Sequence, residues 1–437
     1  MQQMWRAVAC LLLAALGGGC DRGPARPSPS AVAGQTGRKS LPEMRDSDIL
    51  RLDLIPMRSS TPPGWLWFEP DIEARADPDF RAIAASPGGR LVALVHPQRA
   101  PANCQLALLL MGPSEAKLRC LDRDPMAVMT GGFGPAVALS AQQAAVAWPV
   151  QVDAVGRPKA TRILLMNPNG STLCAASIPE PIGALVFAGE ATLLAFVASP
   201  GGESTRWQFR VVRATCQLGD AFGPEFSTGV VAGAQASTNG TVSVLHATST
   251  NWQVSRFAPG MTTATVAFDS SQGRYFTQLE LGLVRDSAVW VGTERSAPNA
   301  NGTFELWTVP AASNVWVHVR SFAPVAGAHT SFSLGFAPGQ TCRAEVVDKK
   351  SPEQVCYRVA CFWSTGDFAG YAPLPGEFGL FPKPRTTSTT SGLTVWAGDR
   401  RLPASATSGT LVWRPWYLVG VGAQPALTPT PPTCTTP

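Results

Sequence analysis

Ionisable side chains are scarce in this sequence. Asp, Glu, Lys and Arg make up 15% of its 437 residues, against a typical share of about 25%. The formal net charge of +5 comes from scattered residues, and no basic run could neutralise a row of phosphates. We therefore expect no nucleic-acid partner.

Recognisable catalytic and ligand-binding motifs are also missing. The sequence has no Gly-x-Ser-x-Gly elbow, phosphate loop or calcium loop, and no two of its four histidines have the i, i+4 spacing of a helical zinc site. His96 and His246 end apolar runs in equivalent positions, so they are either ordinary strand-end side chains or a metal-binding pair. Ser114 and Lys117 have a Ser-x-x-Lys spacing, but in a polar turn without a companion motif. We predict no catalytic residue, metal or cofactor, although acids from separate segments could still converge.

Near the N-terminus the apolar run is short. Arg6 precedes about ten apolar residues at 7–16, about half of what a membrane-spanning helix needs, and small residues lead to Cys20. This pattern predicts a cleaved export signal at 1–19. "LGGGC" resembles the lipobox of bacterial lipoproteins, although Leu16 lies four residues before the Cys instead of three. The resemblance implies acylation of Cys20 and a lipid anchor in a bacterial cell-envelope membrane, in either leaflet; the alternative is ordinary secretion with Cys20 as a thiol.

The chain then divides by composition. Residues 20–42 contain few large apolar side chains and many Pro, Ser, Gly and Arg, which predicts a flexible tether. Residues 43–425 form the predicted folded body, and 426–437 a Pro- and Thr-rich tail.

Eight cysteines of the mature chain could pair completely if Cys20 is acylated, and their spacing favours disulfides over zinc sites. The most local pairs would each close a hairpin. We predict the pairings Cys104–Cys120, Cys342–Cys356, Cys174–Cys216 and Cys361–Cys434.

What the sequence does have is a repeat. With 41 Gly, 39 Pro and 13 Trp, it favours strands and turns over helices. Short apolar runs recur 46 to 54 residues apart, and each is followed by a second run that alternates more clearly. The first runs begin at Leu91, Ala144, Thr192, Val242, Ala288, Cys342 and Leu393; the second begin at Cys104, Arg162, Trp207, Trp252, Phe304, Val355 and Leu411.

Seven units of about 50 residues predict an all-β fold, a seven-bladed β-propeller with four strands per blade. Two β-sandwich domains are the alternative. In the propeller, we expect the first runs to be inner strands, and the alternating segment Leu50 to Ile55 to close the ring on the last blade. Asn-Gly pairs at 169, 239 and 301 predict type I′ hairpin turns; they also fit the glycosylation sequon.

The segment "ASPGGRLVALV" from Ala85 to Val95 resembles the repeats of TolB-like and WD40-like bacterial propellers, with Gly88 where those repeats usually carry Asp. The other units are degenerate. The resemblance implies an architecture and a binding scaffold, and it assigns no functional residue.

The link between the sixth and seventh units, 364–392, is too long for a simple connection. Its aromatic residues either pack inward or contact a partner; the binding candidates are Phe368, Tyr371, Phe378 and Phe381. We therefore expect a noncatalytic, envelope-anchored scaffold that recognises a protein or polysaccharide through one face of the propeller. The alternatives are a hydrolase or lyase with an active site at the channel mouth, and a repeat module without a ligand.

Overall fold

The computed structural model describes about two thirds of the chain, and none of the described residues is helical. None of them belongs to a helix long and apolar enough to cross a membrane. Residues 45–437 form one compact unit. The described residues are 49–56, 61–76, 83–86, 88–98, 104–123, 134–152, 158–201, 204–227, 230–236, 239–247, 252–269, 276–284, 288–295, 303–309, 317–322, 334–337, 340–351, 354–363, 367–374, 378–388, 394–401, 412–421 and 426–430.

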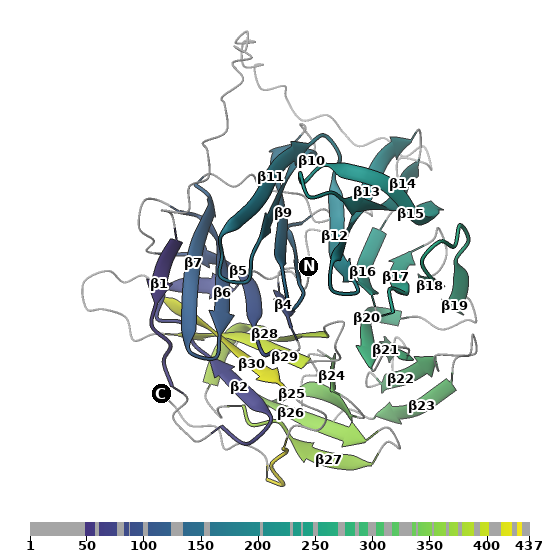
Figure 1. The fold of residues 1–437 in the computed structure, drawn as a ribbon. Helices are drawn as coiled ribbons and strands as arrows, with labels where there is room; N and C mark the ends of the chain where they lie inside the picture. The colour runs from purple at the N-terminus through teal and green to yellow at the C-terminus, as the bar shows by residue number, and fades with distance from the viewer. Residues whose placement is uncertain are drawn as a thin grey trace, which may run out of the picture. The chain divides into compact units, whose positions relative to one another are not determined.

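The first sheet is antiparallel, with strand order β1-β7-β6-β5-β3, and β4 also pairs with β5 (Figure 1). Its strongly apolar runs are buried on both faces, as in "LVALV" of β5, so the sheet must be covered on both sides. Its strands are β1 (Ile49–Leu52), β3 (Ala74–Ala76), β4 (Ile83–Ala85), β5 (Leu91–Pro97), β6 (Leu106–Gly112) and β7 (Glu115–Asp122).

Four sheets follow, each a four-stranded meander of consecutive antiparallel strands. Their strands are β8 (Ala136–Leu139), β9 (Ala144–Val152), β10 (Pro158–Met166) and β11 (Thr172–Ile178); β12 (Ile182–Ala188), β13 (Thr192–Gly201), β14 (Ser204–Val212) and β15 (Leu218–Ser227); β16 (Val230–Ala236), β17 (Val242–Ala247), β18 (Trp252–Phe257) and β19 (Thr265–Asp269); β20 (Phe276–Val284), β21 (Ala288–Arg295), β22 (Thr303–Val309) and β23 (Val317–Phe322).

An eight-stranded sheet completes the set, in the order β2-β30-β29-β28-β26-β25-β24, with β27 paired to β26. Two predicted units are joined here, because β26 pairs with both β27 and β28. The strands are β2 (Trp65–Phe68), β24 (Leu334–Ala337), β25 (Gln340–Ser351), β26 (Gln354–Trp363), β27 (Phe368–Tyr371), β28 (Phe378–Ser388), β29 (Thr394–Arg401) and β30 (Trp413–Gly420).

Contacts between sheets form a closed succession of strands. β4 contacts β8, β8 contacts β12, and the succession continues through β16, β20, β24 and β28 back to β4. Buried side chains fill the spaces between sheets, and one cluster joins Tyr417 and Val419 of β30 to the first sheet. The all-β, propeller-like class is therefore confirmed. Seven blades remain a prediction, because two predicted units share one hydrogen-bonded sheet.

All the predicted first and second runs are strands, but the first runs do not lie innermost. In the meander of β8 to β11, for example, the first run is β9, the second strand of the sheet. The preceding short strand, β8, provides the contact with neighbouring sheets.

Closure occurs at a different segment from the predicted one. β1, which contains Leu50, pairs with β7 of the first sheet, whereas β2 pairs with β30, near the other end of the chain. The alternation that suggested closure belongs instead to a partly exposed edge strand. β2 does not alternate, because Trp65 and Phe68 are both buried.

Two predicted hairpin turns are present, but they are not of type I′. That type needs positive φ at both central residues, and here only Gly170 (+94°) and Gly240 (+82°) have it. At the first turn, Gly170 N–H donates to Asn167 O (2.9 Å) and Asn167 N–H to Ser171 O (2.9 Å), as in a longer turn that ends with a left-handed glycine. Asn301 and Gly302 lie outside the described residues.

Candidate functional site

Few large hydrophobic side chains are exposed in the part of the chain whose side chains are described. The exposed ones are Leu50, Leu173, Met261 and Phe368, and Phe368, at 49% exposure, is the only aromatic among them. An exposed aromatic side chain is a candidate contact point for a partner.

Phe368 belongs to a small group on β26 and β27, which we call the β27 patch: Arg358, Phe368 and Tyr371. The ring of Phe368 meets that of Tyr371 edge-on, with centroids 5.0 Å apart and an interplanar angle of 64°. The guanidinium carbon of Arg358 lies 5.4 Å from the centroid of Tyr371, within cation–π range. The two strands thus present a cation and two rings side by side.

The backbone under this patch is held by the chain's C-terminal part. Tyr371 N–H donates to Thr428 O and Thr428 N–H donates to Tyr371 O, both at 2.8 Å. Trp65 Nε1–H donates to Ala426 O (2.7 Å), and Ala426 N–H donates to Pro63 O (3.0 Å). Residues 426–430, which we call the C-terminal strap, therefore connect β27 to the turn before β2, although they had been predicted as the start of a tail.

Glycine is required where the strap crosses β27. A Cβ on Gly370 would lie 2.8 Å from Leu427 Cβ and 3.0 Å from Thr428 O, and its φ of +140° is unfavourable for other residues. Beneath the patch lies an apolar cluster of Trp65, Val359, Cys361, Ala372, Leu374 and Leu418, with Trp67, Ala369, Trp416 and Leu427 packed against it. The patch is thus a rigid surface.

Two of the four predicted binding residues come together in this patch. Phe378 and Phe381 lie on β28, but their side chains are outside the described part. The predicted long link, 364–392, is wrong in one respect: much of it forms β27 and β28. Arg358 was missed, and its only sequence signal is its place in the alternating second run of the sixth unit.

A second polar cluster lies between the first and last sheets. Arg414 forms ion pairs with Asp71 (2.6 Å) and with the buried Glu69 (3.8 Å). Arg75 lies 4.0 Å from the buried Asp399. Because each of these acids faces an arginine, the cluster compensates buried charge and ties the N-terminal segment to β29 and β30. Among the described residues, no three His, Cys, Asp or Glu side chains are grouped to hold a metal ion.

The two strand-end histidines bond within their own sheets. His96 Nδ1 lies 3.2 Å from Gln105 O. His246 is buried, its Nε2 lies 2.9 Å from Ser255 Oγ, and its ring packs against Phe226. Desolvation lowers the pKa of His246. These are the contacts of ordinary strand histidines, although Nδ1 of His246 is buried without a hydrogen-bond partner in the described part of the chain.

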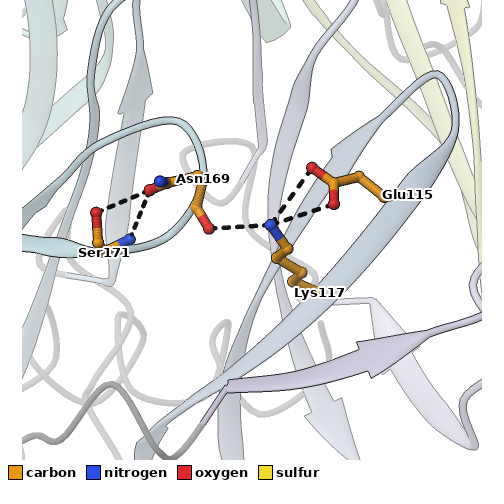
Figure 2. Close-up of polar contacts among 4 residues, drawn as sticks. All are labelled: Glu115, Lys117, Asn169 and Ser171. Carbon is orange, nitrogen blue, oxygen red and sulfur yellow. Dashed lines mark hydrogen bonds and ion pairs between the residues drawn. The ribbon is translucent and has the colours of Figure 1, made fainter.

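Lys117 makes contacts that stabilise the fold, not those of a catalytic base. Its ammonium pairs with Glu115 (3.2 Å) and donates to Asn169 O (3.3 Å), as Figure 2 shows. On the same strand, the fully buried Arg119 donates to Gly170 O (2.6 Å) and Thr172 Oγ1 (2.7 Å). β7 thereby fastens the first sheet to the β10–β11 turn.

Two predicted disulfides form. Cys104–Cys120 lies within the first sheet, and Cys174–Cys216 joins β11 to the turn after β14. Cys216 has a φ of +61°, a conformation usually left to glycine.

Of the other two predicted pairings, Cys342–Cys356 does not fit the strand register, and Cys361–Cys434 stays a prediction. The register places Cys342 opposite Cys361, whereas Cys356 lies opposite Asp348, so Cys342 and Cys356 are too far apart along the strands for a bridge. Cys361 is disulfide-bonded. Cys20 and Cys434 lie outside the described residues.

Comparisons with known proteins give a fold but no family. No family model matches the sequence, and no curated protein matches it significantly. The polysaccharide lyase Uly1 is similar over 79% of this chain and 91% of its own, with a TM-score of 0.50 and 9% identity. A putative 6-phosphogluconolactonase from Bacteroides fragilis (79% and 97%, TM-score 0.42, 12% identity) and a prolyl endopeptidase (77% and 45%, TM-score 0.40, 14% identity) are further matches.

This chain spans only about half the length of the prolyl endopeptidase and of a puromycin hydrolase that it also matches, 45% and 55%. The likeness to the lyase, at 9% identity, supports the fold alone. These comparisons show an all-β, propeller-like fold.

Proposed function

We propose that this protein is a noncatalytic binding module, displayed in the cell envelope, that recognises an envelope protein or polysaccharide through the β27 patch. The observation that carries the proposal is the exposed ring of Phe368 on β27, which meets Tyr371 edge-on, while Arg358 of β26 lies over the ring of Tyr371. Aromatic residues and arginine are enriched at the energetic centres of interfaces.

Rigidity supports a binding role for this surface. The strap fixes the backbone of Tyr371 through two hydrogen bonds, and the apolar cluster supports it from below. A side chain that is already ordered loses little conformational entropy when a partner binds, so more of the contact energy remains for affinity.

A hydrolase or lyase is the competing proposal. It would need acids or histidines converging at the channel mouth, supplied by the first strands of several sheets. Of the strands that link one sheet to the next, β4 (IAA), β8 (AVAL), β12 (IGALVFA), β16 (VVAGAQA) and β24 (LGFA) have no ionisable side chain. β20 carries Glu280, and β28 carries Lys383 and Arg385, so these strands together supply one acid and no histidine. The buried acids Glu69 and Asp399 face arginines. These observations favour binding.

Attachment through an acylated Cys20, after removal of residues 1–19, is part of the same proposal. It is supported by the disulfides, which persist in oxidising compartments. Incorporation of a labelled fatty acid into the protein, abolished by Cys20→Ser, is the expected result; labelling that persists in this variant would contradict the lipid anchor at that residue.

The binding role is tested with a photo-crosslinking amino acid placed at Phe368, in cells that carry the intact envelope. A matched probe at Leu173, 45% exposed in another sheet, controls for general stickiness. We expect a discrete adduct from position 368, weakened by Arg358→Ala, and none from position 173. Protease or glycosidase digestion of the adduct then identifies the class of partner. Equal adducts from both positions, or none from 368, would contradict the proposal.

A further inference from the structure

The third sheet (β12 to β15) and the fourth sheet (β16 to β19) meet along a row of aromatic side chains, which we call the aromatic seam. Phe257 of the fourth sheet lies 5.9 to 6.1 Å, between ring centroids, from Phe209, Phe222 and Phe226 of the third. A Cβ on Gly223 would overlap the ring of Phe257. Buried residues of both sheets join in one hydrophobic cluster here, so the aromatic seam is closely packed.

His246 is an ionisable side chain inside this apolar seam. It alternates along β17 with Val242 and Val244, which face the third sheet within the cluster. The ring is 5% exposed, and that of Phe226 lies against it with centroids 5.2 Å apart. Nε2 lies 2.9 Å from Ser255 Oγ, whereas Nδ1 is buried without a hydrogen-bond partner in the described part of the chain.

The strands packed around His246 bring no counterion to it. β16 and the rest of β17 have no charged residue. The charged residues of the other strands are Asp220 and Glu225 on β15, Arg256 on β18 and Asp269 on β19. Both acids of β15 form ion pairs with arginines, at 3.8 and 3.3 Å. Arg256 follows Ser255 and therefore lies on the other face of β18, and β19 lies beyond β18 from β17. Desolvation is accordingly the cause that lowers the pKa of His246.

A proton on His246 would be poorly accommodated in the closed seam. The charged ring carries a hydrogen on both nitrogens, and only Nε2 has a partner within reach. The ring has its own sheet behind it and Phe226 of the third sheet against it, so water reaches Nδ1 only when the two sheets part. We propose that the aromatic seam is an acid-sensitive joint, which opens locally when His246 binds a proton from the solvent.

The opening is confined to one end of the seam. His246 lies opposite Val231 in the register of β16 with β17, near the point where the chain passes from β15 to β16. The contacts of β16 with β12 and β20 are made elsewhere along that strand pair, and β12 and β16 have no ionisable side chain. Acid would therefore expose the rings of Phe226 and Phe257 while the succession of sheets persists.

Hydrogen exchange of the full-length protein, measured between about pH 7.5 and about pH 5, tests the joint. Rates are corrected for the pH dependence of intrinsic exchange, and peptides of β15 and β17 are compared with those of β5 and β6 in the first sheet. Below about pH 6.5 the open state binds the proton before the closed state does. We expect the opening equilibrium at β15 and β17 to rise by up to about tenfold per pH unit, until the lower pKa of the closed state is reached.

Two variants separate His246 from other groups that titrate in acid. His246→Gln, which can keep a hydrogen bond to Ser255, should abolish the acid response of β15 and β17. His96→Gln, at a half-buried histidine of the first sheet, is the matched control and should leave the response unchanged. Binding of an apolar fluorescent dye should rise in acid in the natural protein and in the control, but not in His246→Gln.

The outcomes are decisive even if His246→Gln does not fold. In the natural protein, exchange that accelerates equally in the first sheet and at the seam would overturn the proposal, because the opening would then not be local. No acceleration at β15 and β17 would overturn it as well. If the variant folds and keeps the acid response, another group controls the seam and the proposal is wrong.

Discussion

His246 is one of few buried ionisable side chains in the described part of the chain, and its surroundings disfavour its charged form. Its Nε2 reaches Ser255 Oγ at 2.9 Å, and Phe226 packs against its ring with centroids 5.2 Å apart. Neither group carries a compensating negative charge. Desolvation therefore lowers the pKa of His246 below its usual value of 6.5.

This environment predicts a stability that falls in acid. Below pH 6.5 the unfolded chain binds a proton at His246 before the folded chain does, so the free energy of unfolding decreases as pH falls. The loss stops growing once pH reaches the lower pKa of the folded state. We expect His246→Gln, which can keep the bond to Ser255, to lose less stability than the natural protein between about pH 7 and about pH 5. Parallel denaturant titrations measure this difference; identical losses would contradict a neutral, desolvated His246.

Among the elements, β27 depends on a segment far along the chain. The strap pairs with Tyr371 and places Leu427 and the carbonyl of Thr428 against Gly370. Since the β27 patch stands on this strand, the strap contributes to the surface that we propose for binding.

Gly370→Ala tests this contact. The new Cβ would meet Leu427 and Thr428 at 3.0 Å or less, at a φ of +140°, and we expect a loss of about 2 to 4 kcal/mol in the free energy of unfolding. Gly260→Ala is the control, because Gly260 has a φ of +80° with nothing within 4 Å; it should lose about 1 kcal/mol. Hydrogen exchange at Tyr371 and Thr428 should accelerate only in the first variant. Equal losses in the two variants would show that the strap does not press on β27.

The same elements show what local sequence could and could not predict. Continuous apolar runs identified β5, β9 and β13, because strands covered on both faces need no alternation. β28 was missed because Pro382 and Pro384 suggest a loop; the register of β28 with β29 shifts between Leu380 and Arg385, around these two prolines.

The pairing of residues far apart in the sequence could not be predicted from local patterns, for a different reason. Neighbouring strands of one hairpin bring Cys104 and Cys120 together, so their spacing in the sequence was enough to predict the disulfide. The Cys342–Cys361 register depends on where a long hairpin turns. In the candidate site, the aromatic residues of the 364–392 segment pointed to Phe368 and Tyr371. The strap could not be found in this way, because it contacts Tyr371 from 57 residues further along the sequence.

At the scale of the whole folded unit, the two ends of the described chain meet in one sheet. β2 pairs with β30 through Trp65↔Gly420 and Phe68↔Tyr417, and the first strands contact one another in a succession that returns from β28 to β4. Arg414 adds ion pairs to Glu69 and Asp71. Hydrogen bonds and ion pairs thus hold β2 and the residues after it to β30, and the apolar packing of Tyr417 and Val419 holds the first sheet to the last.

β2, and not β1, completes the last sheet. Leu66 faces Val419 across this pair, and directly opposed residues of antiparallel strands lie about 4.5 to 5.5 Å apart, which suits a disulfide. We predict that Leu66→Cys with Val419→Cys forms that bridge on mild oxidation, as peptide mapping of the non-reduced protein would show, and that Leu50→Cys with Val419→Cys does not. A bridge in the second variant without one in the first would contradict the pairing of β2 with β30.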